Sequence, residues 1–152
     1  MTISIAAVLL WLFVINLGIV VGAGLYENRV VVPLWASDPP RSLTTPDSGL
    51  RFWALVTTGP LTLLTLANLA AAWMSGGTAR AWWLAASLVV LVERVVTFAY
   101  FIPAMLALQR DTTVPPAELR ARLARWARLG YLRILLCFAG WIGAMRVLVM
   151  LG

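Results

Sequence analysis

Two apolar runs joined by a four-residue turn decide the fold of this chain. They read FWALVTTGPLTLLTLANLAAAWM (residues 52–74), SGGT (75–78) and AWWLAASLVVLVERVVTFAYFIPAMLALQ (81–109). Each run is longer than the roughly 20 apolar residues that cross a bilayer as an α-helix. A turn this short makes consecutive helices antiparallel neighbours. The stretch therefore predicts a transmembrane helical hairpin.

Two further apolar runs extend the hairpin to four helices. Residues 1–26 carry no charged side chain, and residues 129–152 carry only Arg133 and Arg146. A four-stranded barrel is excluded, because open sheet edges cannot face lipid. We predict an all-α, integral membrane, antiparallel four-helix bundle that forms a single domain over residues 1–152. The expected helices span about residues 3–30, 52–75, 81–109 and 116–151, the last entering the membrane from about residue 129.

The composition argues against most classes of soluble protein. Of the 152 residues, 62% are hydrophobic and 12% are charged, whereas soluble domains have about 45–50% and 25%. The mean hydropathy of +0.90 indicates a chain whose solvent is lipid. There is no His and a single Cys, Cys137, which excludes His-ligated metals, zinc clusters and an internal disulfide. We therefore expect no metal and no cofactor.

The distribution of arginine predicts the orientation. All 12 basic residues are Arg and the net charge is +6. Seven of them lie in the loops at about residues 31–51 and 110–128, whereas the opposite side has only Arg80. The positive-inside rule places both loops in the cytoplasm and both termini outside, as expected for the bacterial inner membrane. Arginine beside anionic headgroups explains the net charge, so we expect the lipid bilayer and no nucleic acid as a partner.

Polar side chains inside the predicted helices are the candidates for function, because charges at bilayer depth are costly and face the bundle interior. We counted about 1.5 Å per residue from the arginine-rich ends. Asn16 then lies about 21 Å deep, and Asn68, Glu93 and Arg146 each lie about 24 Å deep. These residues, together with Arg94, are predicted to form one polar layer.

A second and shallower layer holds Glu27 and Arg133. An unpaired charge in either layer would cost several kcal/mol, so each glutamate needs a cation. Structural ion pairs that only fix the helix register explain these residues as well as a reaction centre does. The simplest pairs are Glu27 with Arg133 or Arg29, and Glu93 with Arg146 or Arg94.

Helical spacing adds candidates for substrate contacts. Glu93, Thr97 and Tyr100 are spaced i, i+4 and i+7, so they share one stripe of their helix. Asn68 belongs to a stripe of threonines on the preceding helix, where hydrogen bonding between helices is the alternative explanation. A pocket of about 300–1,000 Å³ lined by Glu93 and Tyr100 would indicate an enzyme or a binding protein. A filled core with paired charges would indicate a structural protein.

Four short motifs resemble one known family. They are GAGLYE (22–27), VVVPLW (30–35), YFIP (100–103) and the pattern Arg125-Trp126 followed by Arg133. Together they resemble the anthrone-oxygenase-like family of small four-helix membrane proteins. The resemblance implies a cofactor-free enzyme that uses O₂ to convert the activated methylene of a polycyclic anthrone into a ketone.

In such an enzyme the protein supplies a base, a cation and a dry cavity. Glu93 is one candidate base, with Arg94 or Arg146 stabilising the enolate; Glu27 with Arg133 is the other. Orientation of a hydrophobic small-molecule substrate would fall to the polar residues Asn16, Asn68, Thr97 and Tyr100. The rival hypothesis is a non-catalytic accessory or structural subunit, in a homo-oligomer or a larger membrane complex.

Overall fold

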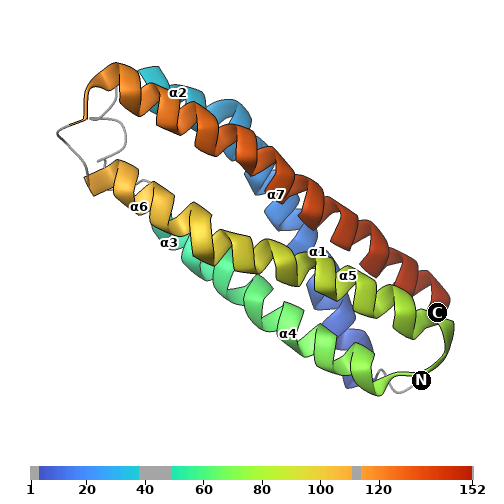
Figure 1. The fold of residues 1–152 in the computed structure, drawn as a ribbon. Helices are drawn as coiled ribbons and strands as arrows, with labels where there is room; N and C mark the ends of the chain where they lie inside the picture. Colours follow the sequence, from blue (N-terminus) through green and yellow to red (C-terminus); the bar gives the residue numbers. More distant parts are fainter. Residues whose placement is uncertain (1–3, 38–48, 111–113, 152) are drawn as a thin grey trace.

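The computed structural model describes residues 4–37, 49–110 and 114–151, and these form a helical bundle (Figure 1). Within these described ranges, four helical rods are long and apolar enough to cross a membrane: Ile5–Ser37, Trp53–Met74, Gly77–Arg110 and Pro116–Leu151. The predicted all-α bundle is therefore confirmed. The start of α1 (Ile5–Tyr26) and the end of α7 (Pro116–Leu151) lie at the same end of the bundle as the turn between α4 (Gly59–Met74) and α5 (Gly77–Val96).

Three of the four rods are interrupted by a wide π-helical turn. The first rod runs from α1 (Ile5–Tyr26) through η1 (Glu27–Val31) into α2 (Val32–Ser37). The second begins at α3 (Leu50–Phe52) and passes through η3 (Trp53–Thr58) into α4. The third joins α5 through η4 (Thr97–Phe101) to α6 (Ile102–Arg110), whereas α7 (Pro116–Leu151) is one unbroken helix.

A proline explains each π turn. Pro33, Pro60 and Pro103 each follow a π turn by two residues. Proline inside a helix lacks an N–H and its ring clashes with the carbonyl four residues earlier, and the widened turn makes room for it. The π character is visible in the backbone N–H of Val32, Gly59 and Ile102, each of which donates to the carbonyl five residues before it.

The prediction that residues 31–51 form a loop is wrong for the part that the structure describes. The first rod continues through Pro33 to Ser37, and the second begins at Leu50. Pro33 lies inside this continuous rod, and the π turn before it makes room for the proline ring. The remainder of this predicted loop, residues 38–48, lies outside the described residues.

The most extensive helix packing joins α5 to α7. A Cβ at Gly140 would clash with the side chain of Val90, and one at Gly143 would come within 3.0 Å of Ala86 Cβ. Since neither glycine has a side chain, the two helices approach closely in the core. A second apolar cluster, which includes Leu108, Leu119 and Leu123, packs the arginine-rich end of the bundle.

We expect the same substitution to have opposite effects at two helical glycines. Gly140→Ala should lower the free energy of unfolding by about 1–3 kcal/mol, because overpacking forces the helices apart. Gly22→Ala should be neutral or stabilise by up to about 1 kcal/mol through helix propensity, because a Cβ at this glycine would meet nothing within 4 Å. Unfolding in mixed micelles measures the free energy of unfolding of both variants. Equal changes in this free energy for Gly140→Ala and Gly22→Ala would contradict the packing described.

Candidate functional site

The three π turns come together around one pocket, which has a volume of about 90 Å³. Residues of all three turns line this π-turn pocket, and α7 closes it from the opposite side. π turns widen a helix and often accompany functional sites. Their convergence therefore makes this level of the bundle the candidate functional site. The residues that line the pocket from these elements are Glu27, Trp53, Thr58, Thr97, Phe101, Trp126 and Arg133.

An ion pair forms the polar wall of the pocket. Arg133 Nη2 lies 3.3 Å from Glu27 Oε2, and Glu27 is 6% exposed. The Arg133 guanidinium also lies over three aromatic rings, at 5.7 Å from Trp53, 4.8 Å from Phe101 and 5.9 Å from Trp126. Cation–π contacts of this kind hold a guanidinium in a desolvated place. Arg133 is therefore fixed by both the carboxylate and an aromatic cage.

A second ion pair lies deeper and is almost completely saturated. The Glu93 carboxylate accepts two hydrogen bonds from Arg94, at 2.6 and 2.7 Å, and one from Thr97 Oγ1 at 2.8 Å. Glu93 is fully buried. Arg133 Nε lies 4.0 Å from Glu93 Oε1, so Arg133 joins the two pairs. Two carboxylates and two guanidinia make a compact group that is neutral when all four are ionised.

A small inner chamber adjoins this network. It has a volume of about 20 Å³ and is lined by Arg94, Arg133, Thr57 and Cys137, among others. Arg94 Nη1 is buried and has no hydrogen-bond partner among the residues that the structure describes. A chamber of this size holds one water molecule. We expect an internal water to satisfy this donor, because an unpaired buried donor is costly.

A larger hollow lies beside the π-turn pocket on the side of α1 and η3. This outer groove has a volume of about 540 Å³ and is open at the bundle surface. It shares Glu27, Trp35 and Trp53 with the π-turn pocket, and Tyr26 and Phe52 add apolar walls. A hydrophobic molecule in this groove would therefore reach the Glu27 carboxylate without leaving an apolar surface.

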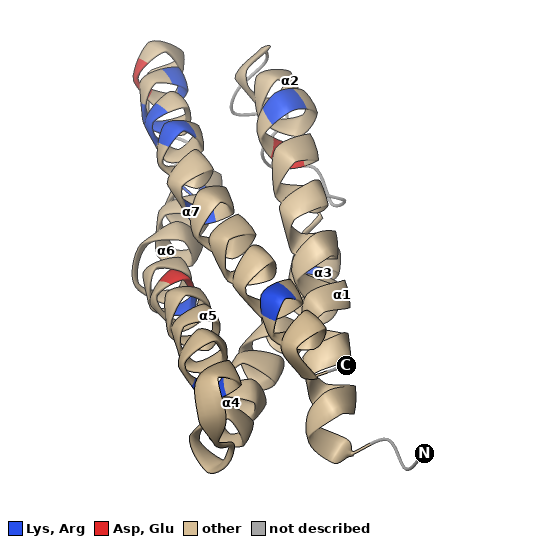
Figure 2. Cartoon of the chain, turned by 90° about the vertical axis from the view of Figure 1, so that its right-hand side faces the viewer, with Lys and Arg blue, Asp and Glu red and all other residues tan. Residues whose placement is uncertain are grey.

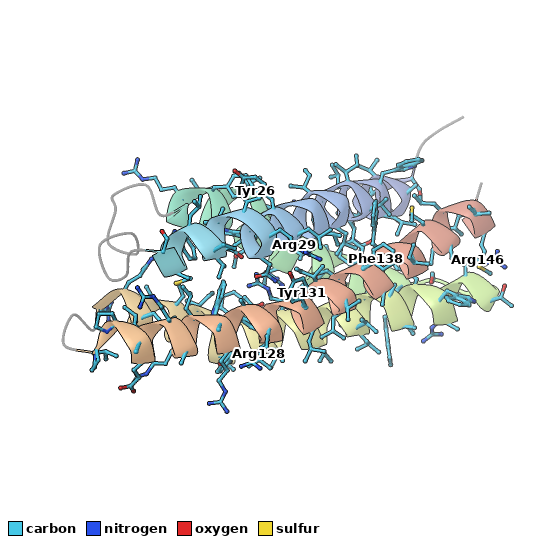
Figure 3. The ribbon with its side chains drawn as sticks, turned by 90° about the horizontal axis from the view of Figure 1, so that it is seen from above. Tyr26, Arg29, Arg128, Tyr131, Phe138 and Arg146 are labelled. Atoms are coloured by element: carbon cyan, nitrogen blue, oxygen red, sulfur yellow. The ribbon has the colours of Figure 1, made fainter. Side chains whose placement is uncertain are left out.

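Arg146 does not belong to this site. The prediction that it lies level with Glu93 is wrong, because Arg133 occupies that level and Arg146 lies 13 residues, or about 20 Å, farther along α7. The predicted depth of Arg146 assumed that α7 enters the membrane near residue 129. In the structure, Leu119 already packs in the same apolar cluster as Leu108. Arg146 is exposed near the opposite end of the bundle (Figure 3).

Asn68 also lies away from the predicted layer. Its side chain donates to the carbonyl of Leu9 at 3.1 Å and accepts from Trp83 Nε1 at 3.0 Å. The short turn at Ser75 and Gly76 places Asn68 opposite Trp83, each seven residues from the turn. Thr58 lies 17 residues before Ser75, and Glu93 lies 17 residues after Gly76. Thr58, rather than Asn68, is therefore level with Glu93.

Asn16 has a structural partner close to the expected depth. Its Nδ2 donates to the carbonyl of Val56 at 3.1 Å. Val56 is four residues before Pro60, so its carbonyl lacks the N–H that would otherwise pair with it. Asn16 therefore compensates for a proline on a neighbouring helix, and it is not among the residues that line the π-turn pocket.

The π turn also explains the fate of the predicted Glu93–Thr97–Tyr100 stripe. Thr97 keeps its place beside Glu93, but Tyr100 is 37% exposed and faces a different groove. A π turn contains more residues than an α turn, so the residue that faces the pocket moves on by one, to Phe101. The i, i+7 rule failed because it assumed an uninterrupted α-helix.

Several residues of the site were missed from the sequence: Trp53, Thr58, Phe101 and Trp126. Two signals were available. The short hairpin turn predicts that Thr58 is level with Glu93. The prolines within three of the apolar stretches lie at a common depth in the bundle, next to the π turns that line the pocket. Among the residues that the structure describes, no three Cys, Asp or Glu side chains come together as a metal site would require.

Comparisons of the chain with protein-family models, curated proteins and solved structures found no match. The arrangement combines a carboxylate that can accept a proton, a fixed cation beside it and an apolar approach. These features suit proton removal from a hydrophobic molecule and stabilisation of the anion that results.

Proposed function

We propose that the protein is a membrane-embedded, cofactor-independent oxygenase that acts on a hydrophobic phenolic polycycle of the anthrone type. The single observation that carries the proposal is the Glu27–Arg133 pair in the wall of an aromatic pocket inside the bundle. The sequence motifs that resemble anthrone oxygenases support the same chemistry, because GAGLYE ends at Glu27. Glu27 is the proposed base and Arg133 the proposed cation.

The structure favours Glu27 over Glu93 as the base. Both oxygens of Glu93 accept hydrogen bonds from Arg94, one accepts a third from Thr97, and the residue is fully buried. Within the described part of the chain Glu27 has one ion-pair contact, the longer one to Arg133, and it lines both the π-turn pocket and the outer groove. A base must reach the proton that it removes, so the Glu93 pair is assigned a supporting role.

The proposed reaction balances with O₂ as the only co-reactant. Glu27 takes one proton from the methylene carbon, and Arg133 stabilises the enolate. The carbanion transfers one electron to O₂, and the radical pair recombines into a C–O bond, which gives a peroxide anion. Glu27 returns its proton to the terminal oxygen. Loss of the second C–H proton with cleavage of the O–O bond then yields the ketone and one water.

The π-turn pocket and the outer groove are proposed to hold the substrate together. Neither the π-turn pocket, at about 90 Å³, nor the outer groove, at about 540 Å³, is lined by Glu93 or Tyr100, so neither is the pocket that the sequence led us to expect beside those residues. Of these two hollows, the outer groove has the size of a typical ligand site, roughly 300–1,000 Å³. The ring system is proposed to lie in the outer groove between Tyr26 and Phe52. The reacting carbon then points at the edge shared by both hollows, where Glu27 lies.

We further propose that the arginine-rich end faces the cytoplasm of a bacterial inner membrane. Figure 2 shows basic residues gathered on α7 toward the end away from the C-terminus. Arg120, Arg122, Arg125 and Arg128 belong to this segment. The positive-inside rule supports this direction. Labelling of single cysteines introduced at either end of the bundle in intact cells tests it.

Oxygen uptake by the purified protein tests the function. In lipid nanodiscs with an anthrone, the wild type should consume one O₂ per substrate and release the ketone. Arg146→Gln should leave the rate unchanged, because Arg146 lies about 20 Å from the site along α7. Uptake no faster than with empty nanodiscs would refute the proposal and favour a non-catalytic subunit.

A further inference from the structure

We infer that a groove between α6 and α7 binds the headgroup of an anionic phospholipid. This groove has a volume of about 300 Å³ and lies on the outside of the bundle. Arg122 and Arg125 line it from α7, and Ala104 and Ala107 line it from α6. It thus combines two guanidinia with a small-residue apolar wall, which is the chemistry that a phosphate attached to acyl chains requires.

The walls of the groove are fixed by the fold. Trp126, which forms part of the wall, is 4% exposed, and its Nε1 donates to the carbonyl of Phe101 at 3.2 Å. Leu108, which also lines the groove, belongs to the apolar cluster that joins α6 to α7. Ala104 and Ala107 do not fill the space between the helices. The fold therefore fixes the apolar wall of the groove, and the two exposed arginines complete it from α7.

Charge complementarity favours an anion at this place. Arg122 pairs with Glu118 at 2.7 Å, but both side chains are about half exposed, so the pair contributes little stability. Arg125 has no ion pair or hydrogen bond within residues 4–37, 49–110 and 114–151. Within the same described residues Glu118 pairs with Arg122 and no carboxylate pairs with Arg125, so the Arg125 guanidinium offers a positive charge that a phosphate would neutralise. Arginine suits this role because its guanidinium matches a phosphate in two-point contact.

The depth of the groove matches the headgroup region. The rod Gly77–Arg110 has 34 residues and is about 50 Å long, whereas the hydrocarbon core is about 30 Å thick. We expect the arginine-rich end to be the part that extends beyond the hydrocarbon, because arginine inside it is costly. Arg122 and Arg125 lie six and nine residues after the start of α7 at Pro116, where long cationic side chains extend toward headgroups. The apolar wall continues toward Tyr100, along which an acyl chain can lie.

This site is separate from the proposed reaction centre. The groove shares only the Trp126 ring with the π-turn pocket, and neither glutamate of the ion-pair network lines it. The inference therefore does not depend on the proposed function. An anionic lipid bound here would tie α6 to α7 beside the pocket that these helices help to enclose.

Binding to the purified protein in a neutral detergent tests the inference. Native mass spectrometry should show saturable binding of one phosphatidylglycerol, and phosphatidylcholine should bind at least about tenfold more weakly. Arg125→Gln should weaken phosphatidylglycerol binding about tenfold. The matched control is Arg128→Gln, which removes an exposed arginine of the same segment that projects away from the bundle (Figure 3), and it should weaken binding less than about threefold.

A second variant tests the apolar wall. Ala107→Trp should block the groove and weaken phosphatidylglycerol binding, while leaving the positive charge intact. Equal losses for Arg125→Gln and Arg128→Gln would show diffuse attraction to basic charge and overturn the site. Equal binding of phosphatidylglycerol and phosphatidylcholine would overturn the role of the guanidinia. Both readouts come from folded protein, because the substituted side chains are exposed.

Discussion

Glu93→Gln should lower the free energy of unfolding by about 3–5 kcal/mol, which is the usual cost of removing one partner from a buried ion pair. Arg94 is 5% exposed and depends on Glu93 for both of its hydrogen bonds to a carboxylate. An amide at this position leaves a buried guanidinium without a counter-charge. Unfolding of the protein in mixed micelles, followed by circular dichroism, measures the loss.

Two comparisons separate this effect from a general loss of charge. Glu118→Gln makes the same chemical change at an exposed pair with Arg122 and should change stability by no more than about 1 kcal/mol. Replacing Glu93 and Arg94 together by Leu and Met should recover much of the stability, since apolar residues of similar volume can replace a buried pair. Equal losses for Glu93→Gln and Glu118→Gln would contradict the burial described.

Glu27→Gln should reduce the rate of anthrone oxidation by about 10²- to 10⁴-fold, the range typical of losing a general base. Gln has nearly the same shape as Glu, and Arg133 keeps its contacts with Trp53, Phe101 and Trp126. The pocket should therefore persist while the proton acceptor is lost. The measurement is the turnover rate for O₂ uptake at saturating substrate.

The matched control for this prediction is again Glu118→Gln, which should retain the full rate because Glu118 lies on the exposed first turn of α7. Glu27→Asp should restore part of the rate, since it keeps a carboxylate but shortens its reach. If Glu27→Gln retains activity while a folded Glu93→Gln variant loses it, the base is Glu93 and the assignment of roles between the two pairs is wrong.

Much of the architecture could be predicted from local sequence. Apolar runs of sufficient length predict helices in lipid because every backbone N–H and C=O must find a partner within its own segment. The same constraint made buried ion pairs predictable, and the Glu27–Arg133 pair and the Glu93–Arg94 pair are each among the alternatives that the sequence left open. The short turn at Ser75 and Gly76 likewise made α4 and α5 neighbours.

The site itself was only partly predictable. Depth was counted along each helix from its own end, and this works only when the ends lie level. The first turns of α7 pack beside the end of α6, through Leu119 and Leu108. As a result Arg133, rather than Arg146, lies beside Glu93. Face assignments failed beyond each π turn, where Phe101 rather than Tyr100 turned to the pocket.

The sequence alone determined that this chain belongs in a membrane as four helices and that its few internal charges must be paired. These properties follow from length, hydropathy and the cost of desolvation, which act on each segment separately. Only the tertiary structure decided which arginine meets which glutamate and where a pocket opens. Those outcomes depend on the position of each helix along its neighbours. Close packing at Gly140 and the widened turns before three prolines together determine these positions.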